Sequence, residues 1–276
     1  MDLPAPDLHV QGLDVRLEKE HVLRGVTFAV EARATLAVIG VSGSGKTTLL
    51  RAIAGLIPIE RGHILLGGRR VDELAPNRRN IVYLNQEPLL FPHLDLFENM
   101  AFGLRLRSVR EDEIRERIDV LIGSLELHGL SGRYAHALSG GQRQRVAFGR
   151  ALAVEPAMML LDEPFSNLDP ETRAGMQELF KRVSRERGIS AIFVTHDLKE
   201  SLRVGDRFAV LRDGGLRSFA DRAEFCRDPS SGVAREASYW RMLTGSEGNE
   251  SSGVGTQHVA GMAQAFANCD DDHGDK

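Results

Sequence analysis

A glycine-rich segment at residues 40–48, GVSGSGKTT, has the residue types and spacing that bind phosphate groups. It fits the pattern G-x-x-x-x-G-K-[ST], and it lies between a continuous apolar run, TLAVIG, and a segment with helical apolar spacing, KTTLLRAIAGL. The N–H groups of such a turn surround phosphate oxygens, the lysine adds a cation, and the hydroxyl that follows can ligate Mg²⁺. We expect a nucleoside triphosphate site formed by Gly40, Val41, Ser42, Gly43, Ser44, Gly45, Lys46, Thr47 and Thr48, with Thr47 also a metal ligand.

A pair of carboxylates ends a second apolar run, MMLLDEP, at residues 158–164. The four apolar residues predict a buried strand, and Pro164 stops it. Asp162 would hold Mg²⁺ directly or through water, and Glu163 would orient or deprotonate the water that attacks a γ-phosphorus. An acidic pair at a strand end can also simply cap the segment that follows, so this expectation depends on its combination with the glycine-rich segment.

A third segment, LSGGQRQRVAFGRAL at residues 138–152, predicts a glycine turn that opens directly into an amphipathic helix. The Ser139 hydroxyl and the N–H groups of Gly140 and Gly141 would point toward a phosphate together with the positive end of the helix. An ordinary serine helix cap is the alternative interpretation of the same letters.

The three segments together resemble the ATP-binding subunits of ABC transporters, from about residue 8 to about residue 235. The resemblance implies that the LSGGQ segment of one subunit closes over the ATP held by another, so the chain would act as a homodimer or with a homologous ATPase subunit. It also implies that Gln86 reaches Mg²⁺ and the attacking water, that residues 166–169 cross the dimer, and that His196 contacts the γ-phosphate. The implied catalytic residues are Glu163, His196 and Gln86, and the implied metal ligands are Thr47, Gln86 and Asp162.

Residues 87–105 are similar to the same region of the ATPases of bacterial importers that are fed by binding proteins. This resemblance implies transmembrane permease subunits that contact residues 87–105, an extracytoplasmic substrate-binding protein as an indirect partner, and a peripheral position on the cytoplasmic face of the inner membrane. The competing hypotheses are a non-transport ABC ATPase of DNA repair or translation, a P-loop kinase or GTPase, and a scaffold that does not hydrolyse ATP. A long coiled-coil insertion or a second cassette, typical of the first alternative, is not present in the sequence.

One position departs from the family pattern. Where a relative often stacks an aromatic ring on adenine, this sequence has Leu17, and no Tyr or Phe stands nearby in VRLEKEHVL. Leu17 or His21 could pack on the base instead. We therefore expect base affinity or base preference to differ from that of relatives with the aromatic residue.

The elements that must position these residues alternate between strand and helix. Residues 8–39 and 61–71 predict an N-terminal lobe of short strands, and AMMLL and ISAIFV predict buried parallel strands separated by a helix. Ser108 and Glu111 have capping-box spacing before a helix with Ile114, Ile118 and Leu121 on one face. We expect an α/β fold of the P-loop NTPase class, with a RecA-like parallel sheet, an antiparallel β lobe and an inserted helical lobe at about residues 88–150. The ATP-binding domain would span residues 8–240, and residues 241–276 would form a disordered acidic tail.

Composition excludes several other classes of protein. No segment is apolar over the roughly 18 residues of a membrane-spanning helix, and the N-terminus lacks the pattern of a signal peptide. The net charge is −4, and residues 1–240 contain 33 basic and 33 acidic side chains. Because a nucleic-acid-binding protein usually has an excess of basic residues that neutralise phosphates, we expect no nucleic-acid partner.

Overall fold

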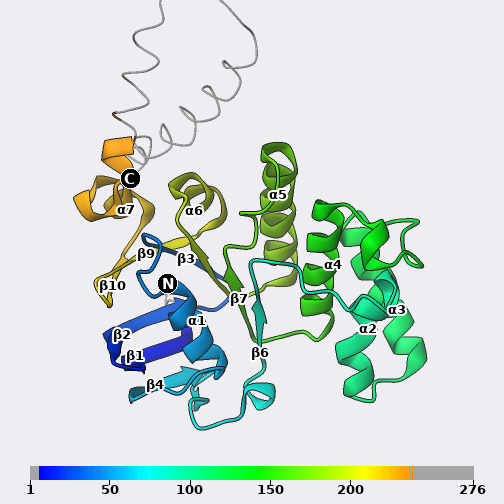
Figure 1. The fold of residues 1–276 in the computed structure, drawn as a ribbon, viewed down its shortest axis with the longest axis horizontal. Helices are drawn as coiled ribbons and strands as arrows, with labels where there is room; N and C mark the ends of the chain where they lie inside the picture. Colours follow the sequence, from blue (N-terminus) through cyan, green and yellow to red (C-terminus); the bar gives the residue numbers. More distant parts are fainter. Residues whose placement is uncertain (1–5, 237, 239–276) are drawn as a thin grey trace, which may run out of the picture.

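The computed structural model describes residues 6–236 and residue 238. The acidic tail predicted at residues 241–276 lies outside the described residues. Within them the chain forms two β-sheets with α-helices packed on and beside them (Figure 1). The α/β class predicted from the sequence is confirmed.

A six-stranded, mostly parallel sheet forms the centre of the molecule. Its strands, β10-β9-β3-β8-β7-β6 in spatial order, are β10 Gly215–Phe219, β9 Arg207–Arg212, β3 Thr35–Ile39, β8 Ala191–Thr195, β7 Met158–Asp162 and β6 Ile81–Leu84. All neighbouring pairs are parallel except β9 and β10. Both faces are covered: in β7, Met159 and Leu161 belong to one apolar cluster, and Met158 and Leu160 to another. This two-sided burial explains why the strand is continuously apolar.

The second sheet is antiparallel, with strands β2 Glu20–Glu31, β1 Pro6–Leu17, β4 Arg61–Leu66 and β5 Arg69–Arg70 in that spatial order. Helix α1, Lys46–Ala54, packs between this sheet and the central sheet (Figure 1). Its buried Leu49, Leu50 and Ile53 contribute to the apolar cluster that the two sheets share. The predicted β lobe therefore lies on one side of the glycine-rich turn at the start of α1.

Three helices extend from the β6 edge of the central sheet (Figure 1): α2 Leu96–Leu106, α3 Glu111–Ser124 and α4 Gly140–Ala153. The predicted apolar face of α3 is confirmed, because Ile114, Ile118 and Leu121 are buried. The predicted capping box is wrong. Helix α3 begins at Glu111 with Arg110 as its N-cap residue, and Ser108 adopts a left-handed φ of 55° in the preceding turn. Ser108 therefore forms part of the turn between α2 and α3 and does not cap the helix.

Helices α5 Pro170–Arg187 and α6 Leu198–Val204 cover the other face of the central sheet, and α7 Arg222–Arg227 packs beside β9 and β10. There are also short 3₁₀ helices at Pro76–Arg78, Ala135–Ala137 and Pro229–Ser231, and residues 233–236 are helical. Among the described residues, no helix has the length and apolar character required to span a membrane.

Candidate functional site

The glycine loop, residues 40–48, the pair Asp162 and Glu163, and His196 lie together at the carboxyl ends of strands β3, β7 and β8. The register pairs Ile39 with Thr195, and Asp162 with Val194, so these three strands end at the same edge of the sheet. The glycine loop follows β3, and His196 follows β8. Parallel α/β sheets place their ligand sites at this edge.

The glycine loop has a backbone that side chains would obstruct. Gly43 and Gly45 have φ values of 82° and 101°. A Cβ atom on Gly40 would lie 2.5 Å from Ser44 Oγ and 2.6 Å from the carbonyl oxygen of Leu211, so residue 40 must be glycine in this conformation. The Ser44 hydroxyl is buried and has no hydrogen-bond partner among the described residues. A tightly wound turn with an unpaired buried hydroxyl suits an anionic group such as a phosphate.

Lys46 is held at the start of α1 with its ammonium group inside the loop. Its side chain is 6% exposed, and Nζ donates hydrogen bonds to the carbonyl oxygens of Gly40 at 2.8 Å and Val41 at 3.1 Å. Burial lowers the pKa of Lys46, and the negative charges of Glu163 and Asp162 partly oppose this effect. A bound triphosphate would add negative charge next to Nζ and favour the ammonium form.

Asp162 joins three elements through its two carboxylate oxygens. Thr47, on α1, donates its hydroxyl to Oδ1 at 3.1 Å, and Tyr83, on β6, donates its phenol to Oδ2 at 2.7 Å. Burial, followed by the hydrogen bond to Asp162, raises the pKa of Tyr83 to about 12. Tyr83 was not among the predicted site residues, because its contact with Asp162 spans 79 residues of chain and leaves no local pattern in the sequence.

The oxygen donors of Thr47 and Asp162 fit Mg²⁺, which prefers such ligands. Among the described residues, no group of three or more His, Cys, Asp or Glu side chains is placed to hold a metal ion. In a nucleotide site, Mg²⁺ is held by one or two protein oxygens together with phosphates and water. The residues therefore match a nucleotide-bound ion and do not form an all-protein cage.

Glu163 and His196 contact each other across the ends of β7 and β8. Glu163 Oε2 and His196 Nδ1 are 2.9 Å apart, and Glu163 Oε1 lies 3.8 Å from Lys46 Nζ. The backbone of Glu163 is left-handed, with φ 45°, and its N–H donates to the carbonyl oxygen of Val194 at 3.1 Å. This unusual backbone directs the carboxylate away from the strand, toward the lysine and the histidine.

The predicted second anion site lies at the start of α4. Ser139 caps the helix in a capping box: its hydroxyl accepts from the N–H of Gln142, and the Gln142 side chain accepts from the N–H of Ser139. Ser139 and Gly140 are exposed, and no hydrogen bond connects Ser139, Gly140 or Gly141 to the glycine loop. Gly141 is buried against α5, where a Cβ atom would lie 2.5 Å from Thr172 Cγ2. The start of α4 therefore has an ordinary serine cap. For this turn to contact a phosphate as well, the phosphate would have to be held by a site other than the glycine loop of the same chain.

Three further predicted residues, Gln86, His21 and Leu17, lie outside the hydrogen-bonded cluster. Gln86 is exposed, two residues beyond the end of β6. His21 contacts Asp14 at 2.9 Å, and Leu17, at the end of β1, is 41% exposed. At Gly45 a Cβ atom would lie 3.1 Å from Val22 Cγ1, so the start of β2 packs directly against the glycine loop.

A parallel sheet with a glycine loop between β3 and α1 is the fold of the P-loop NTPases. Residues 23–166 match the family model described as ABC transporter. The chain is 41% identical over 228 residues to the molybdate/tungstate import ATP-binding protein WtpC of Pyrococcus horikoshii, covering 82% of this chain and 66% of that protein. With WtpC of Thermococcus kodakarensis the identity is 41% over 239 residues, covering 86% of this chain and 72% of that protein. The chain belongs to the ABC transporter family.

Other relatives agree with this assignment. The sulfate/thiosulfate import ATP-binding protein CysA of Xylella fastidiosa is 40% identical over 228 residues, covering 81% of this chain and 66% of that protein. The structure of cbiO1 from Clostridium perfringens, described as part of the ABC transporter complex cbiONQ, matches with a TM-score of 0.75 and 26% identity, covering 88% of this chain and 96% of that chain. The predicted P-loop NTPase fold is confirmed. All three sequence relatives are named as import proteins, which supports the importer hypothesis over the non-transport alternative.

Proposed function

We propose that this chain is the ATP-binding and ATP-hydrolysing subunit of an ABC importer, with its ATP-binding domain at residues 8–240. The observation that carries the proposal is the meeting of Lys46, Glu163 and His196 at one edge of the parallel sheet, next to Asp162. A lysine that can bind phosphates, a carboxylate that can orient water and a histidine in contact with that carboxylate are side chains suited to hydrolysis of ATP.

The glycine loop binds the phosphates through its N–H groups, the Ser44 hydroxyl and Lys46. Thr47 and Asp162 would hold Mg²⁺ through their side-chain oxygens, and Gln86, in the segment after β6, would be a further ligand. The ion, when bound, neutralises charge on the β- and γ-phosphate oxygens. Tyr83 donates to Asp162 Oδ2 and fixes the orientation of the carboxylate that Mg²⁺ would meet.

Glu163 acts as the base that orients or deprotonates the attacking water. Its carboxylate is 19% exposed, close enough to solvent to meet a water and partly shielded from competing ones. His196 Nδ1 lies 2.9 Å from Glu163 Oε2 and holds the carboxylate. The same contact orients the imidazole toward the γ-phosphate. Lys46 balances the charge of Glu163 from the opposite side.

Two copies, or this chain and a homologous ATPase subunit, complete each site. The exposed start of α4, with Ser139, Gly140 and Gly141, meets the triphosphate held by the partner's glycine loop, and residues 166–169 cross the interface. Permease subunits contact residues 87–105, and a substrate-binding protein delivers cargo from outside, so the chain works on the cytoplasmic face of the inner membrane. Because the cargoes named for the relatives differ, and because cargo would contact other subunits, we assign no cargo.

The test is a comparison of ATP binding with ATP turnover in two variants of the chain. Glu163→Gln should bind Mg-ATP with unchanged affinity and lose turnover by about 100-fold or more, because the base is lost and the phosphate contacts remain. Lys46→Ala should weaken ATP binding itself. Glu73→Gln, an exposed carboxylate on the β lobe, is the matched control and should match the parent in both measurements. Turnover by Glu163→Gln near the parent rate would remove Glu163 from the role of base.

A further inference from the structure

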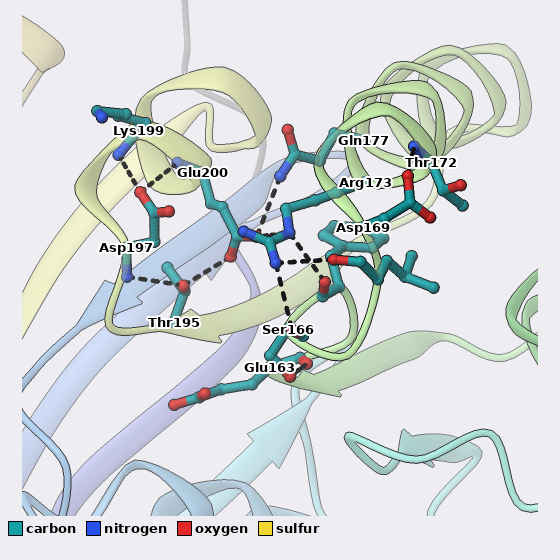
Figure 2. Close-up of polar contacts among 12 residues, drawn as sticks. Glu163, Ser166, Asp169, Thr172, Arg173, Gln177, Thr195, Asp197, Lys199 and Glu200 are labelled. Carbon is teal, nitrogen blue, oxygen red and sulfur yellow. Dashed lines mark hydrogen bonds and ion pairs between the residues drawn. The ribbon is translucent and has the colours of Figure 1, made fainter. Parts of the chain in front are cut away.

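A polar cluster lies beside the candidate site, between α5, α6 and the end of β8 (Figure 2). Its centre is the side chain of Glu200, which is 6% exposed, and Arg173 approaches it with Nε 3.9 Å from Oε1. Gln177 donates to the same carboxylate at 3.1 Å, and Thr195 donates to it at 2.7 Å. The side chains of Glu200, Arg173 and Gln177 lie outside the motifs that predicted the site.

Arg173 holds the carboxylate loop, residues 163–169, which begins with Glu163. Its Nε donates to the carbonyl oxygen of Phe165 at 3.1 Å, and its Nη2 donates to those of Ser166 at 3.2 Å and Leu168 at 2.8 Å. Figure 2 shows the guanidinium directed into the turn of this loop. One side chain therefore fixes three carbonyl groups within five residues of Glu163.

Glu200 holds the histidine loop, residues 195–198, in a comparable way. Its Oε2 accepts the hydroxyl proton of Thr195, and Thr195 Oγ1 accepts the N–H of Asp197 at 3.0 Å. These bonds fix the residue before His196 and the residue after it. Arg173 thus holds the backbone of the loop that begins with Glu163, and Glu200 holds the backbone on either side of His196.

Stabilisation of the core does not by itself explain why Arg173 and Glu200 lie together. The Arg173 side chain is 32% exposed and its Nε lies 3.9 Å from Glu200 Oε1, so this ion pair adds little net stability to the fold. Burial also raises the pKa of Glu200, with the hydrogen bond from Thr195 opposing that rise, so the carboxylate is held in a place that disfavours its charge. The bonds of Arg173 and Glu200 fix loops, and both loops carry a residue of the candidate site.

We infer that Arg173 and Glu200 are positioning residues for hydrolysis, which keep the carboxylate loop and the histidine loop in a fixed relation so that Glu163 and His196 remain in contact. The inference rests on the proposed function. Neither side chain needs to touch the nucleotide, so their loss should affect the chemical step and leave ATP binding intact. We expect loss of either side chain to slow hydrolysis, because a displacement of about 1 Å at a reacting centre can reduce the rate by about 100-fold.

The variants are Arg173→Met, which keeps the length of the stem, and Glu200→Gln, which keeps the shape of the side chain. Arg182→Met is the matched control, because Arg182 lies on the same helix, α5, and also donates to a carbonyl group, of Ser124, and to a carboxylate, of Glu126. We expect kcat to fall by about 10- to 100-fold in the two test variants, with KM and ATP affinity within about twofold of the parent. Equal loss of kcat in Arg182→Met, or parent-like kcat in both test variants, would overturn the inference.

A double variant asks whether the two residues act as one unit. If they do, Arg173→Met with Glu200→Gln should lose about as much kcat as the more severe single variant. If the two losses multiply, the residues act separately and the coupling is disproved.

Amide hydrogen exchange tests the same coupling without any turnover. In Arg173→Met, the amides of the histidine loop should exchange about tenfold faster than in Arg182→Met, although Arg173 makes no hydrogen bond to that loop. A purely local role would accelerate exchange in the carboxylate loop alone. An inactive parent would refute the proposed function, and the exchange result would still support or overturn the inference.

Discussion

Glu163 has a left-handed backbone conformation, which is unfavourable for a residue other than glycine. A left-handed φ of 45° in a residue other than glycine costs on the order of 1–3 kcal/mol, and surrounding contacts must compensate. Its N–H bonds to Val194, and its carbonyl oxygen accepts from the N–H and the hydroxyl of Ser166. The motif letters predict the carboxylate, but this strain and the contacts that stabilise it depend on distant residues.

The hydrogen bond from Tyr83 to Asp162 leads to a prediction about metal affinity. Tyr83→Phe keeps the ring and removes only the phenol that donates to Asp162 at 2.7 Å. Because an outer hydrogen bond of this kind orients a metal ligand, we expect the affinity of the ATP-bound chain for Mn²⁺, a spectroscopic substitute for Mg²⁺, to fall by about tenfold or more. Electron paramagnetic resonance of free Mn²⁺ measures this directly, with ATP saturating.

Tyr134→Phe is the control for Tyr83→Phe, because Tyr134 is 47% exposed and lies at the start of the 3₁₀ helix Ala135–Ala137. It should retain the Mn²⁺ affinity of the parent. If Tyr83→Phe also retains it, the phenol does not orient the metal ligand.

At the scale of elements, the sequence predicts best the segments whose signal is local. The apolar runs identify β3, β7 and β8, and the 3.6-residue period identifies α3, because burial imposes those patterns on the residues themselves. The start of α3 was predicted wrongly, since capping by Ser108 depended on backbone torsions that the sequence pattern does not contain. Arg173, Glu200 and Tyr83 were missed for a related reason: their partners lie on other elements, and each residue alone resembles an ordinary polar residue of a helix or strand.

The C-terminus of helix α1 is likewise held by a polar residue from another part of the chain, Arg79. Arg79 is 7% exposed and donates to the carbonyl oxygens of Ala52 and Ile53 in the last turn, and to those of Asp72 and Leu74 in the β lobe. Arg79→Met would leave four carbonyl groups without this donor, so we expect a loss of about 3 kcal/mol in the free energy of unfolding. Urea unfolding followed by circular dichroism measures it.

Arg78→Met provides the comparison for Arg79→Met, because Arg78 is the adjacent residue and is exposed. Its free energy of unfolding should stay within about 0.5 kcal/mol of the parent. A similar loss in both variants would mean that Arg79 does not anchor α1 through these bonds.

At the scale of the whole molecule, the fold separates two sets of predicted phosphate contacts. The glycine loop lies where α1 meets the central sheet, whereas the start of α4 belongs to the group of helices at the β6 edge (Figure 1). The separate motifs were readable from the sequence because each is local. Their separation within one chain depends on the strand order β3-β8-β7-β6, which no local pattern encodes. Under the proposed function, the two sets of contacts in one copy belong to two different sites, and a second copy supplies the missing half of each.

This arrangement predicts that ATP drives association of the isolated chain. Glu163→Gln should double its mass in light scattering when Mg-ATP is added, because bound ATP adds contacts across the interface and the variant cannot remove them by hydrolysis. Adding Gly140→Glu should abolish the doubling while leaving the fold intact. A Cβ atom on Gly140 meets only Leu168 Cδ2 at 3.9 Å, and a carboxylate is favourable at a helix start but repels phosphate. Doubling that survives Gly140→Glu would place the interface away from α4, and the absence of doubling in Glu163→Gln alone would mean that the nucleotide does not hold two isolated chains together.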